Sequence, residues 1–199
     1  MVTALRFEDY FEEDSLGFED EGEGYDVPFS EYDAKRKSCA FTGHRKIPFE
    51  TKPKLINKLK STILYLVSLG VTEFHCGAAT GFDTLAASVV YDISREHKDV
   101  RLILDIPYSN QAERWGDDDK RYYEFIKSKA HEINVHGNNP KNKEEAVKLL
   151  LSRNRVMIDK SHYCICYLEN PDAKRGGTAY TVNYAKLHDR HIINLAQQE

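Results

Sequence analysis

The stretch CAFTGHRKIP (residues 39–48) places a glycine and two basic side chains directly after a short apolar run. Glycine lets a backbone approach a ligand closely, and imidazole and guanidinium groups donate hydrogen bonds to anions. The candidate ligand-binding residues of this turn are Thr42, Gly43, His44 and Arg45. The alternative interpretation is an ordinary glycine turn followed by solvated basic residues.

A second glycine turn lies in CGAATGFDTLAA, where small residues lead into a helical pattern. The amides and the positive dipole end of such a helix start favour phosphate. The candidates here are Gly77, Ala79, Gly81 and Asp83. Because a carboxylate would compete with phosphate for the same amides, we expect Asp83 to accept a hydrogen bond from a ribose hydroxyl. The simpler interpretation of Asp83 is a helix N-cap.

The third glycine turn is RGGTAYTVNYA, again between an apolar run and a helical pattern. Gly176 and Gly177 bring amides toward a phosphate, and Thr178 is placed to cap the helix. Neither G-x-G-x-x-G nor G-x-x-x-x-G-K-[ST] occurs in the chain. A conventional NAD dehydrogenase or P-loop ATPase is therefore disfavoured.

Two further stretches supply side chains for a pocket beside these turns. In IPYSNQAERW, Pro107 ends an apolar run, while Gln111 and Trp115 are four residues apart and would share a helix face. Trp115 is suited to stacking on a base and Gln111 to hydrogen-bonding its edge. The alternative interpretation is that Trp115 belongs to the core and Gln111 is solvated. In LLLSRNRVMID, Arg153 and Asn154 lie on a predicted helix.

The elements that position these residues alternate between apolar runs and helical periods. Six strands are predicted, at 38–42, 73–77, 100–106, 132–136, 163–168 and 191–195. Helices are predicted at 52–69, 83–97, 111–129 with a break at Gly116, 142–159 and 178–188. This alternation predicts an α/β fold of three layers, with a doubly wound, mainly parallel sheet of about six strands. In such a sheet, ligands bind at the carboxyl ends of the strands, where all three turns lie.

Charge is distributed unevenly along the chain. The whole chain carries a formal charge of −4, yet residues 1–33 hold twelve acidic residues and a single basic one. We predict an acidic, disordered tail at 1–33 and one domain at 34–199. The tail is either a solubilising extension or a segment that docks over basic residues of the body.

The four cysteines lie inside apolar runs, which is typical of a reducing cytosol and predicts a cytoplasmic protein with no membrane segment. Cys164 and Cys166 are not spaced as zinc ligands, and the histidines are scattered. We therefore expect no metal and no other cofactor.

Taken in order, TGHR, GAATGFDTLAA, IPYSNQAERW, SRNRVMIDKSHYCICY and GGTAYTVNYA resemble the YpsA-like branch of the SLOG superfamily, which groups DprA/Smf and LOG proteins. The resemblance covers residues 38–195. It implies a Rossmann-like fold with a nucleotide-type ligand at the glycine turns, and it is compatible with a homodimer. No reaction is implied, because YpsA-like members have no well-established chemistry.

The two better understood relatives lead to different expectations. LOG proteins resemble phosphoribohydrolases, and Arg153 matches their arginine, but Asn183 stands where their glutamate belongs. Asparagine cannot replace a carboxylate that activates water. DprA-like proteins bind single-stranded DNA, and GAATGFDTLAA is similar to one of their turns. The net charge of +7 on residues 34–199, from 27 basic and 20 acidic residues, is modest for that role.

The sequence leaves three functions open. The favoured one is binding of a nucleotide or nucleotide-derived small molecule, as a sensor or a sequestering protein. The enzyme alternative is a nucleotide hydrolase that cleaves a glycosidic or phosphate bond, with Asp83 or His44 as acid or base and Arg153 as a further catalytic candidate. The third is binding of single-stranded DNA, which should weaken steeply with salt.

Overall fold

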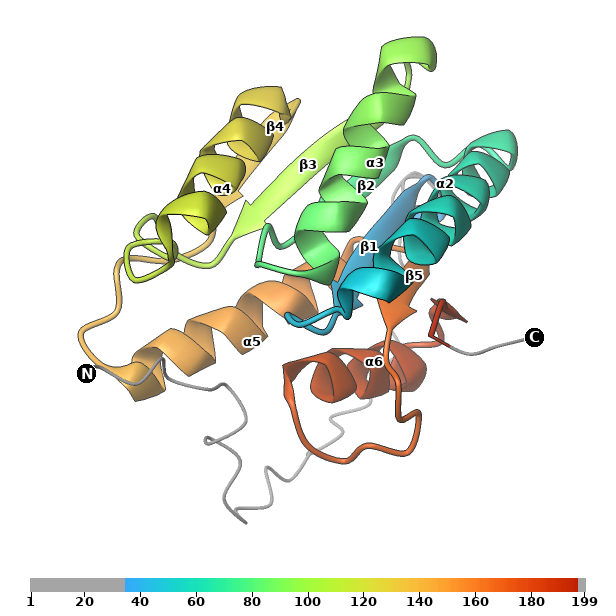
Figure 1. Cartoon of the computed structure of the whole chain (residues 1–199). Helices are drawn as coiled ribbons and strands as arrows, with labels where there is room; N and C mark the ends of the chain where they lie inside the picture. Colours follow the sequence, from blue (N-terminus) through green and yellow to red (C-terminus); the bar gives the residue numbers. More distant parts are fainter. Residues whose placement is uncertain (1–34, 197–199) are drawn as a thin grey trace.

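The computed structural model describes residues 35–196, so the predicted acidic tail lies outside the described residues. Its centre is a six-stranded sheet in which every paired neighbour is parallel, in the order β4-β3-β2-β1-β5-β6 (Figure 1). The strands are β1 (Ser38–Gly43), β2 (Glu73–Cys76), β3 (Arg101–Ile106), β4 (Glu132–Val135), β5 (Tyr163–Tyr167) and β6 (His191–Asn194). The sequence predicted all six, and each boundary within one residue.

Helices cover both faces of the sheet, as the predicted three-layer fold requires (Figure 1). One layer holds α2 (Lys52–Ser68), α3 (Phe82–Glu96) and α4 (Asp117–Lys129), with a short 3-10 helix, η2 (Phe49–Thr51), before α2. The other layer holds α5 (Lys143–Asp159) and α6 (Gly177–Leu187). No helix in residues 35–196 has the length and apolar character needed to cross a membrane.

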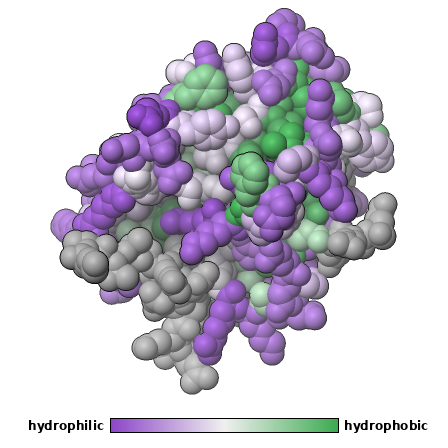
Figure 2. Space-filling view, in the orientation of Figure 1, coloured by the Kyte–Doolittle hydropathy of each residue, from purple (hydrophilic) through white to green (hydrophobic). Residues whose placement is uncertain are grey.

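The apolar periods of the sequence account for how the helices dock. In α2, Leu55, Leu59, Ile63 and Leu66 recur at three- and four-residue steps and are fully or almost fully buried. Leu69, which continues the period, is 52% exposed because it follows the helix as its C-cap. On the face that Figure 2 shows, polar side chains cover most of the helices, and some apolar surface lies between α2 and α3.

The break predicted at Gly116 within the helix at 111–129 is confirmed, but the part before the break is not helical. Residues 110–115 form successive turns with i to i+3 bonds, such as Gln111 N to Tyr108 O at 3.2 Å and Trp115 N to Ala112 O at 3.0 Å. The helix begins at Asp117 because Gly116 is extended (φ −64°, ψ 159°) and three aspartates favour the positive end of the helix dipole. Gln111 and Trp115 therefore do not share a helix face.

The strand order reverses at β1. The chain runs outward from β1 to β4, then crosses to the other side of β1 to form β5 and β6. The three strands that precede the glycine turns, β2, β1 and β5, are consecutive neighbours in the sheet. Their carboxyl ends meet at one edge, and a reversal of this kind leaves a crevice there in doubly wound folds.

Candidate functional site

The first two glycine turns pack directly against each other. The amide of Phe82 donates to the carbonyl of His44 at 3.0 Å. A Cβ added to Gly81 would lie 2.3 Å from the carbonyl oxygen of Arg45, and Gly81 has φ +86°. Only glycine fits both the close approach and the left-handed backbone. A Cβ on Gly43 would likewise lie 2.5 Å from the Phe82 ring, so these glycines hold the turns together.

The loop after β5 joins this pair of turns through His44. The backbone amide of His44 donates to Tyr167 O at 3.3 Å, and the amide of Glu169 donates to His44 Nε2 at 3.2 Å. Because Nε2 accepts in this contact, Nδ1 is the ring nitrogen that carries the proton. His44 thus links the first turn to the segment that leads to the third.

The third turn differs from its prediction in one detail. Gly176, with φ +104°, is the N-cap of α6, and no side chain caps the helix, so Thr178 lies inside α6 rather than at its cap. Asn154 donates its amide to Thr181 Oγ1 at 2.8 Å and so fastens α5 to α6. Thr42 is buried within β1.

Arg153 and Asp83 are packed around Gly77 at the centre of the carboxyl edge. A Cβ on Gly77 would lie 2.1 Å from Arg153 Nη1 and 2.7 Å from Asp83 Oδ2. The absence of a side chain at Gly77 is therefore what admits the guanidinium. Arg153 is 3% exposed, its Nη1 donates to the carbonyl of Asp105 at 2.7 Å, and its Nε has no hydrogen-bond partner within the described residues.

Burial raises the pKa of Asp83 to about 6, although the positive charges of Arg153 and Arg45 and the amide of Ala79 act in the opposite direction. Asp83 is not the N-cap of α3, because Gly81 holds that position. A buried carboxyl that titrates near neutral pH is suited to proton transfer, and it also moderates the positive charge that an anion would meet.

The segment after β3 contributes a second set of buried polar atoms. Pro107 is buried at the end of the strand, and Gln111 is 8% exposed. Burial raises the pKa of Tyr123, and a side-chain hydrogen bond from Gln111 acts in the opposite direction. The Oδ1 atom of Asn110 has no partner among residues 35–196. Trp115 packs edge-on against the Tyr123 ring, with centroids 5.3 Å apart, and contacts the main core. Its predicted role in base stacking stays a prediction.

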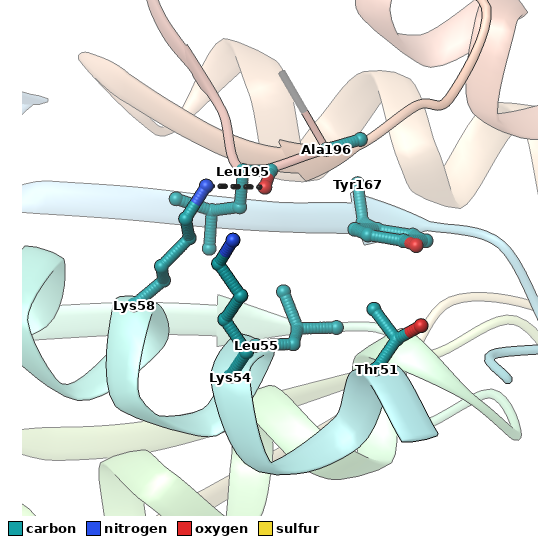
Figure 3. Close-up of a pocket in the computed structure, with 7 residues that line it drawn as sticks. All are labelled: Thr51, Lys54, Leu55, Lys58, Tyr167, Leu195 and Ala196. Atoms are coloured by element: carbon teal, nitrogen blue, oxygen red, sulfur yellow. Dashed lines mark hydrogen bonds between the residues drawn. The ribbon is translucent and has the colours of Figure 1, made fainter. Parts of the chain in front are cut away.

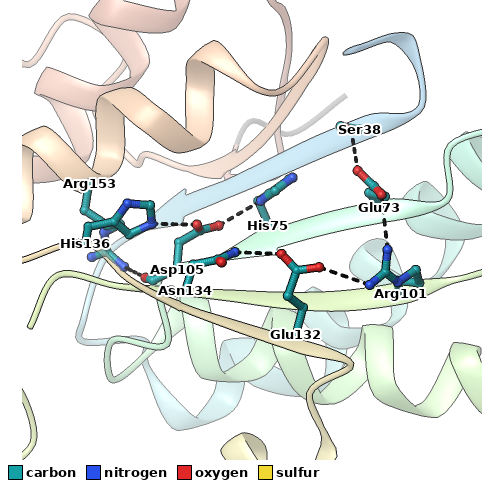
Figure 4. A network of polar contacts seen from close by, with 9 residues as sticks. All are labelled: Ser38, Glu73, His75, Arg101, Asp105, Glu132, Asn134, His136 and Arg153. Carbon is teal, nitrogen blue, oxygen red and sulfur yellow. Dashed lines mark hydrogen bonds and ion pairs between the residues drawn. The ribbon is translucent and has the colours of Figure 1, made fainter. Parts of the chain in front are cut away.

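Three polar residues at this edge were missed by the sequence analysis. Asp105 is fully buried and lies between His75 and His136, with both nitrogen–oxygen distances at 2.7 Å (Figure 4). Burial would raise the pKa of Asp105, but the two imidazoles outweigh it and the pKa is lowered. The available signal was His75 and Asp105 inside the runs EFHC and RLILDI, and His136 directly after EINV.

The cavity in Figure 3 lies apart from these groups. It is enclosed by α2 and the ends of β5 and β6, with a volume of about 360 Å³ that includes open solvent. Leu55, Leu195 and the Tyr167 ring line it, and Lys58 donates to the carbonyl of Leu195 at 3.5 Å. None of the described residues that line it has a buried unpaired polar atom, so its chemistry is less specific than that of the carboxyl edge.

The cysteines of the described chain have the character of core residues. Burial raises the pKa of the Cys39, Cys76 and Cys164 thiols, and that of Cys166 to about 12. All four are free and buried. Within residues 35–196, no cluster of three or more histidine, cysteine or acidic residues is arranged to hold a metal ion.

A parallel sheet with helices on both faces and glycine turns at its carboxyl edge defines a Rossmann-like α/β protein. The YpsA family model, described as the YspA SLOG family, matches residues 39–198. The chain therefore belongs to the YpsA SLOG family.

Individual relatives agree with this membership. A UPF0398 protein of Bacillus cereus (strain G9842) is 32% identical over 106 residues, which are 53% of this chain and 55% of the relative. A second, from Bacillus cereus (strain B4264), is 29% identical over 128 residues, 64% of this chain and 67% of the relative. The match thus spans little more than half the length of the first of these relatives.

Among solved structures, the chain is similar to DNA processing protein A from Helicobacter pylori, described for its single-stranded DNA binding mode. The TM-score is 0.55 at 18% identity, over 85% of this chain and 69% of that one. At this identity the likeness establishes the Rossmann-like fold alone.

Proposed function

We propose that the chain binds a nucleotide or a nucleotide-derived small molecule at the carboxyl edge of its sheet. The observation that carries the proposal is Arg153, a guanidinium that is 3% exposed and keeps an unpaired Nε beside the Gly77 turn. A buried cation with a free donor is costly unless an anion or an acceptor completes it. A phosphate or a ribose oxygen supplies that acceptor.

The remaining residues divide between the two ends of such a ligand. Amides of the three turns, at Gly77, Gly81, Gly176, Gly177 and Thr178, would contact the phosphate or ribose, with His44 and Arg45 adding donors. Gln111, which is 8% exposed and hydrogen-bonds Tyr123, would exchange that contact for the edge of a base. Family membership and the DprA-like neighbour support nucleotide or single-stranded DNA binding as the general class.

A second candidate is hydrolysis of the bound nucleotide. It is favoured by one observation, the buried Asp83 carboxyl whose pKa is raised to about 6. Such a group can exchange a proton at neutral pH. Asn183, which stands where LOG proteins have a glutamate, is exposed on α6, which argues against LOG-type chemistry in particular.

The test begins with the purified full chain. Any small molecule released on denaturation is identified by mass. A nucleotide panel is then titrated by calorimetry against the wild type, Arg153→Gln and the matched control Arg101→Gln, which lies at the amino ends of the strands. We expect binding that weakens at least tenfold in Arg153→Gln, about 1.4 kcal/mol, and is unchanged in the control.

Three other results have distinct meanings. Product formation that Asp83→Asn abolishes would favour the hydrolase. Affinity only for an oligothymidine, with a steep salt dependence, would favour single-stranded DNA. Binding that is equal in the wild type and Arg153→Gln would refute the proposed site.

The domain arrangement is also a proposal. We infer that residues 34–199 fold as one SLOG-type domain and that the acidic segment 1–33 lies outside it. Homodimerisation stays a prediction, which sedimentation of the purified chain would check.

A further inference from the structure

The pocket between α2 and the ends of β5 and β6 combines an apolar floor with a cationic rim. Leu55, Leu195 and the Tyr167 ring form the floor, and the side chains of Lys54 and Lys58 extend from α2 toward the end of β6 (Figure 3). Because the two lysines are four residues apart, they lie on the same side of the helix. The pocket can therefore receive an apolar group on its floor and an anionic group at its rim.

The charged residues of α2 are all of one sign. Its 17 residues include four lysines and no acidic residue. Lys52 and Lys54 lie in the first turn, where the positive end of the helix dipole disfavours cations. Lys54 is exposed and forms no ion pair with any of residues 35–196. Helix stability therefore does not explain these lysines, whereas an anionic partner would.

Residues 1–33 of the same chain carry the complementary chemistry. They hold twelve acidic residues and one basic residue. Within them, the stretch FEDYFEED (residues 7–14) consists only of three aromatic and five acidic residues. An aromatic side chain flanked by carboxylates matches an apolar floor flanked by lysines, and the opposite charges favour the encounter.

The chain is long enough to bring this stretch to the pocket. The described residues begin just before Ser38, at the amino end of β1, whereas Thr51 and the ends of β5 and β6 place the pocket toward the carboxyl ends of the strands. The six residues of β1 span about 20 Å. Residues 15–34 can extend to about 70 Å, so the reach is sufficient without any change in the described residues.

The contacts of Tyr167 set the orientation of a segment bound in the pocket. The Tyr167 hydroxyl donates to Glu169 Oε1 at 3.1 Å, so a carboxylate already lies at this end of the pocket. A second carboxylate would be repelled there. The Tyr167 end therefore suits an aromatic ring, and the end beside Lys54 and Lys58 suits the acidic groups.

We propose that residues 7–14 dock in this pocket, with an aromatic ring against Leu55, Leu195 and Tyr167 and with carboxylates beside the two rim lysines. The partner is a segment of the same chain, so the contact does not depend on protein concentration. The inference does not rest on the proposed nucleotide site, and its tests contain no nucleotide.

A nitroxide label on the acidic segment tests the proposal in the full chain. The four native cysteines are free and buried, so the label reacts selectively at Ser15→Cys, directly after the stretch. We expect the backbone amide signals of residues 51–58 and 195–196 to lose most of their intensity, and those of α4 to keep theirs. Unchanged signals at residues 51–58 and 195–196 would leave the pocket to another occupant and overturn the proposal.

Two lysines of α2 provide a matched pair of charge reversals. Lys54 lines the pocket, whereas Lys60 is exposed on the same helix and does not line it. In the labelled chain, Lys54→Glu should restore most of the lost intensity, and Lys60→Glu should leave it lost. A glutamate in the first turn favours the helix dipole, so unfolding of α2 would not mimic this result. Equal effects of the two substitutions would mean a diffuse attraction to α2 and would overturn docking in the pocket.

The aromatic contact is tested with the charges unchanged. Replacing the three aromatic residues of the stretch 7–14 by serine should restore the signals of residues 51–58, whereas the same replacement of Phe18, Tyr25 and Phe29 should not. Signals that stay weak in the first triple variant would overturn the proposed ring contact.

A mixed sample separates the same chain from a second copy. Labelled chain without 15N is combined with unlabelled 15N chain, and no loss of intensity is expected. A loss at residues 51–58 in this mixture as large as in the labelled 15N chain would assign the contact to a second copy and overturn the proposal.

Discussion

On one face of the sheet, the polar side chains at the amino ends of the strands differ from those at the carboxyl ends in exposure and in hydrogen bonding. At the amino edge, Ser38, Glu73, Arg101, Glu132 and Asn134 form a continuous chain of hydrogen bonds and ion pairs. The charged members are about 40% exposed, so water completes whatever the chain leaves open (Figure 4).

The carboxyl edge instead buries its charges and leaves a donor unpaired. Asp83, Asp105 and Arg153 are all under 10% exposed, and Arg153 Nε lacks a partner in the described chain. Unpaired buried donors destabilise a fold by about 1–3 kcal/mol each. Stability alone therefore explains the amino edge, whereas the carboxyl edge keeps an unpaired guanidinium nitrogen that a ligand would satisfy.

Removing one arginine from each edge tests most strongly whether the two edges differ in stability. Arg153→Met leaves Asp83 as a buried charge without its main partner, and we expect a loss of about 3–5 kcal/mol in the free energy of unfolding at pH 7. Arg101→Met removes only half-exposed ion pairs and should cost about 0–1 kcal/mol. Urea denaturation measures both.

Equal losses for the two arginine variants would show that the edges do not differ. The double variant Asp83→Asn with Arg153→Met is the control for the cause. Because it removes the stranded charge, it should recover part of the stability that Arg153→Met loses.

Two glycines with a left-handed backbone, one at each edge, allow the packing of the two edges to be compared. Gly81→Ala combines a left-handed backbone with a Cβ only 2.3 Å from the Arg45 carbonyl, so a loss of about 3 kcal/mol is expected. Gly70, at the amino edge, has φ +90°, but no atom of residues 35–196 lies within 4 Å of an added Cβ. Gly70→Ala should therefore cost only the strain of about 1–2 kcal/mol. Thermal unfolding of both proteins checks the order, and a larger loss for Gly70→Ala would contradict it.

The smallest expected effect is a pH dependence carried by Asp83. Its folded-state pKa of about 6 lies above the ordinary 3.8, so its contribution favours the fold at low pH and is lost as pH rises through about 6. Relative to Asp83→Asn, the wild type should lose about 2 kcal/mol of stability between about pH 4.5 and about pH 7. Denaturation curves across this range measure the difference.

For this pH effect, Glu132→Gln at the amino edge is the matched control, and its stability should change with pH in parallel with that of the wild type. A constant difference between the wild type and Asp83→Asn at every pH would mean that Asp83 is not the titrating group.

Most of the fold was predictable because parallel strands and docked helices leave strong apolar periods. The six strands follow from runs such as VRLILDI, and the shared edge of the three glycine turns follows from their position after strands. Gly116 marked the break before α4, but the conformation of the segment before it was not predictable in the same way. Residues 111–115 include helix-forming residues, yet they form turns rather than a helix.

The candidate site was predicted in its glycines and in Arg153, but not in its interior. Gly77 admits a guanidinium from a residue 76 positions later, a contact that no local pattern encodes. The pairing of Asp105 with His75 and His136 depends on β2, β3 and β4 being neighbours, which the sequence alone does not specify. Long-range adjacency, rather than local propensity, is what the structure adds.

Backbone amide shifts of the 15N-labelled full chain, recorded during titration with AMP, test most directly whether the carboxyl edge of the sheet holds a nucleotide-type anion. We predict that the largest shifts fall at residues 43–45, 77–83 and 176–178. Shifts confined to the cavity beside α2 and β6, or none with any nucleotide of the panel, would contradict it.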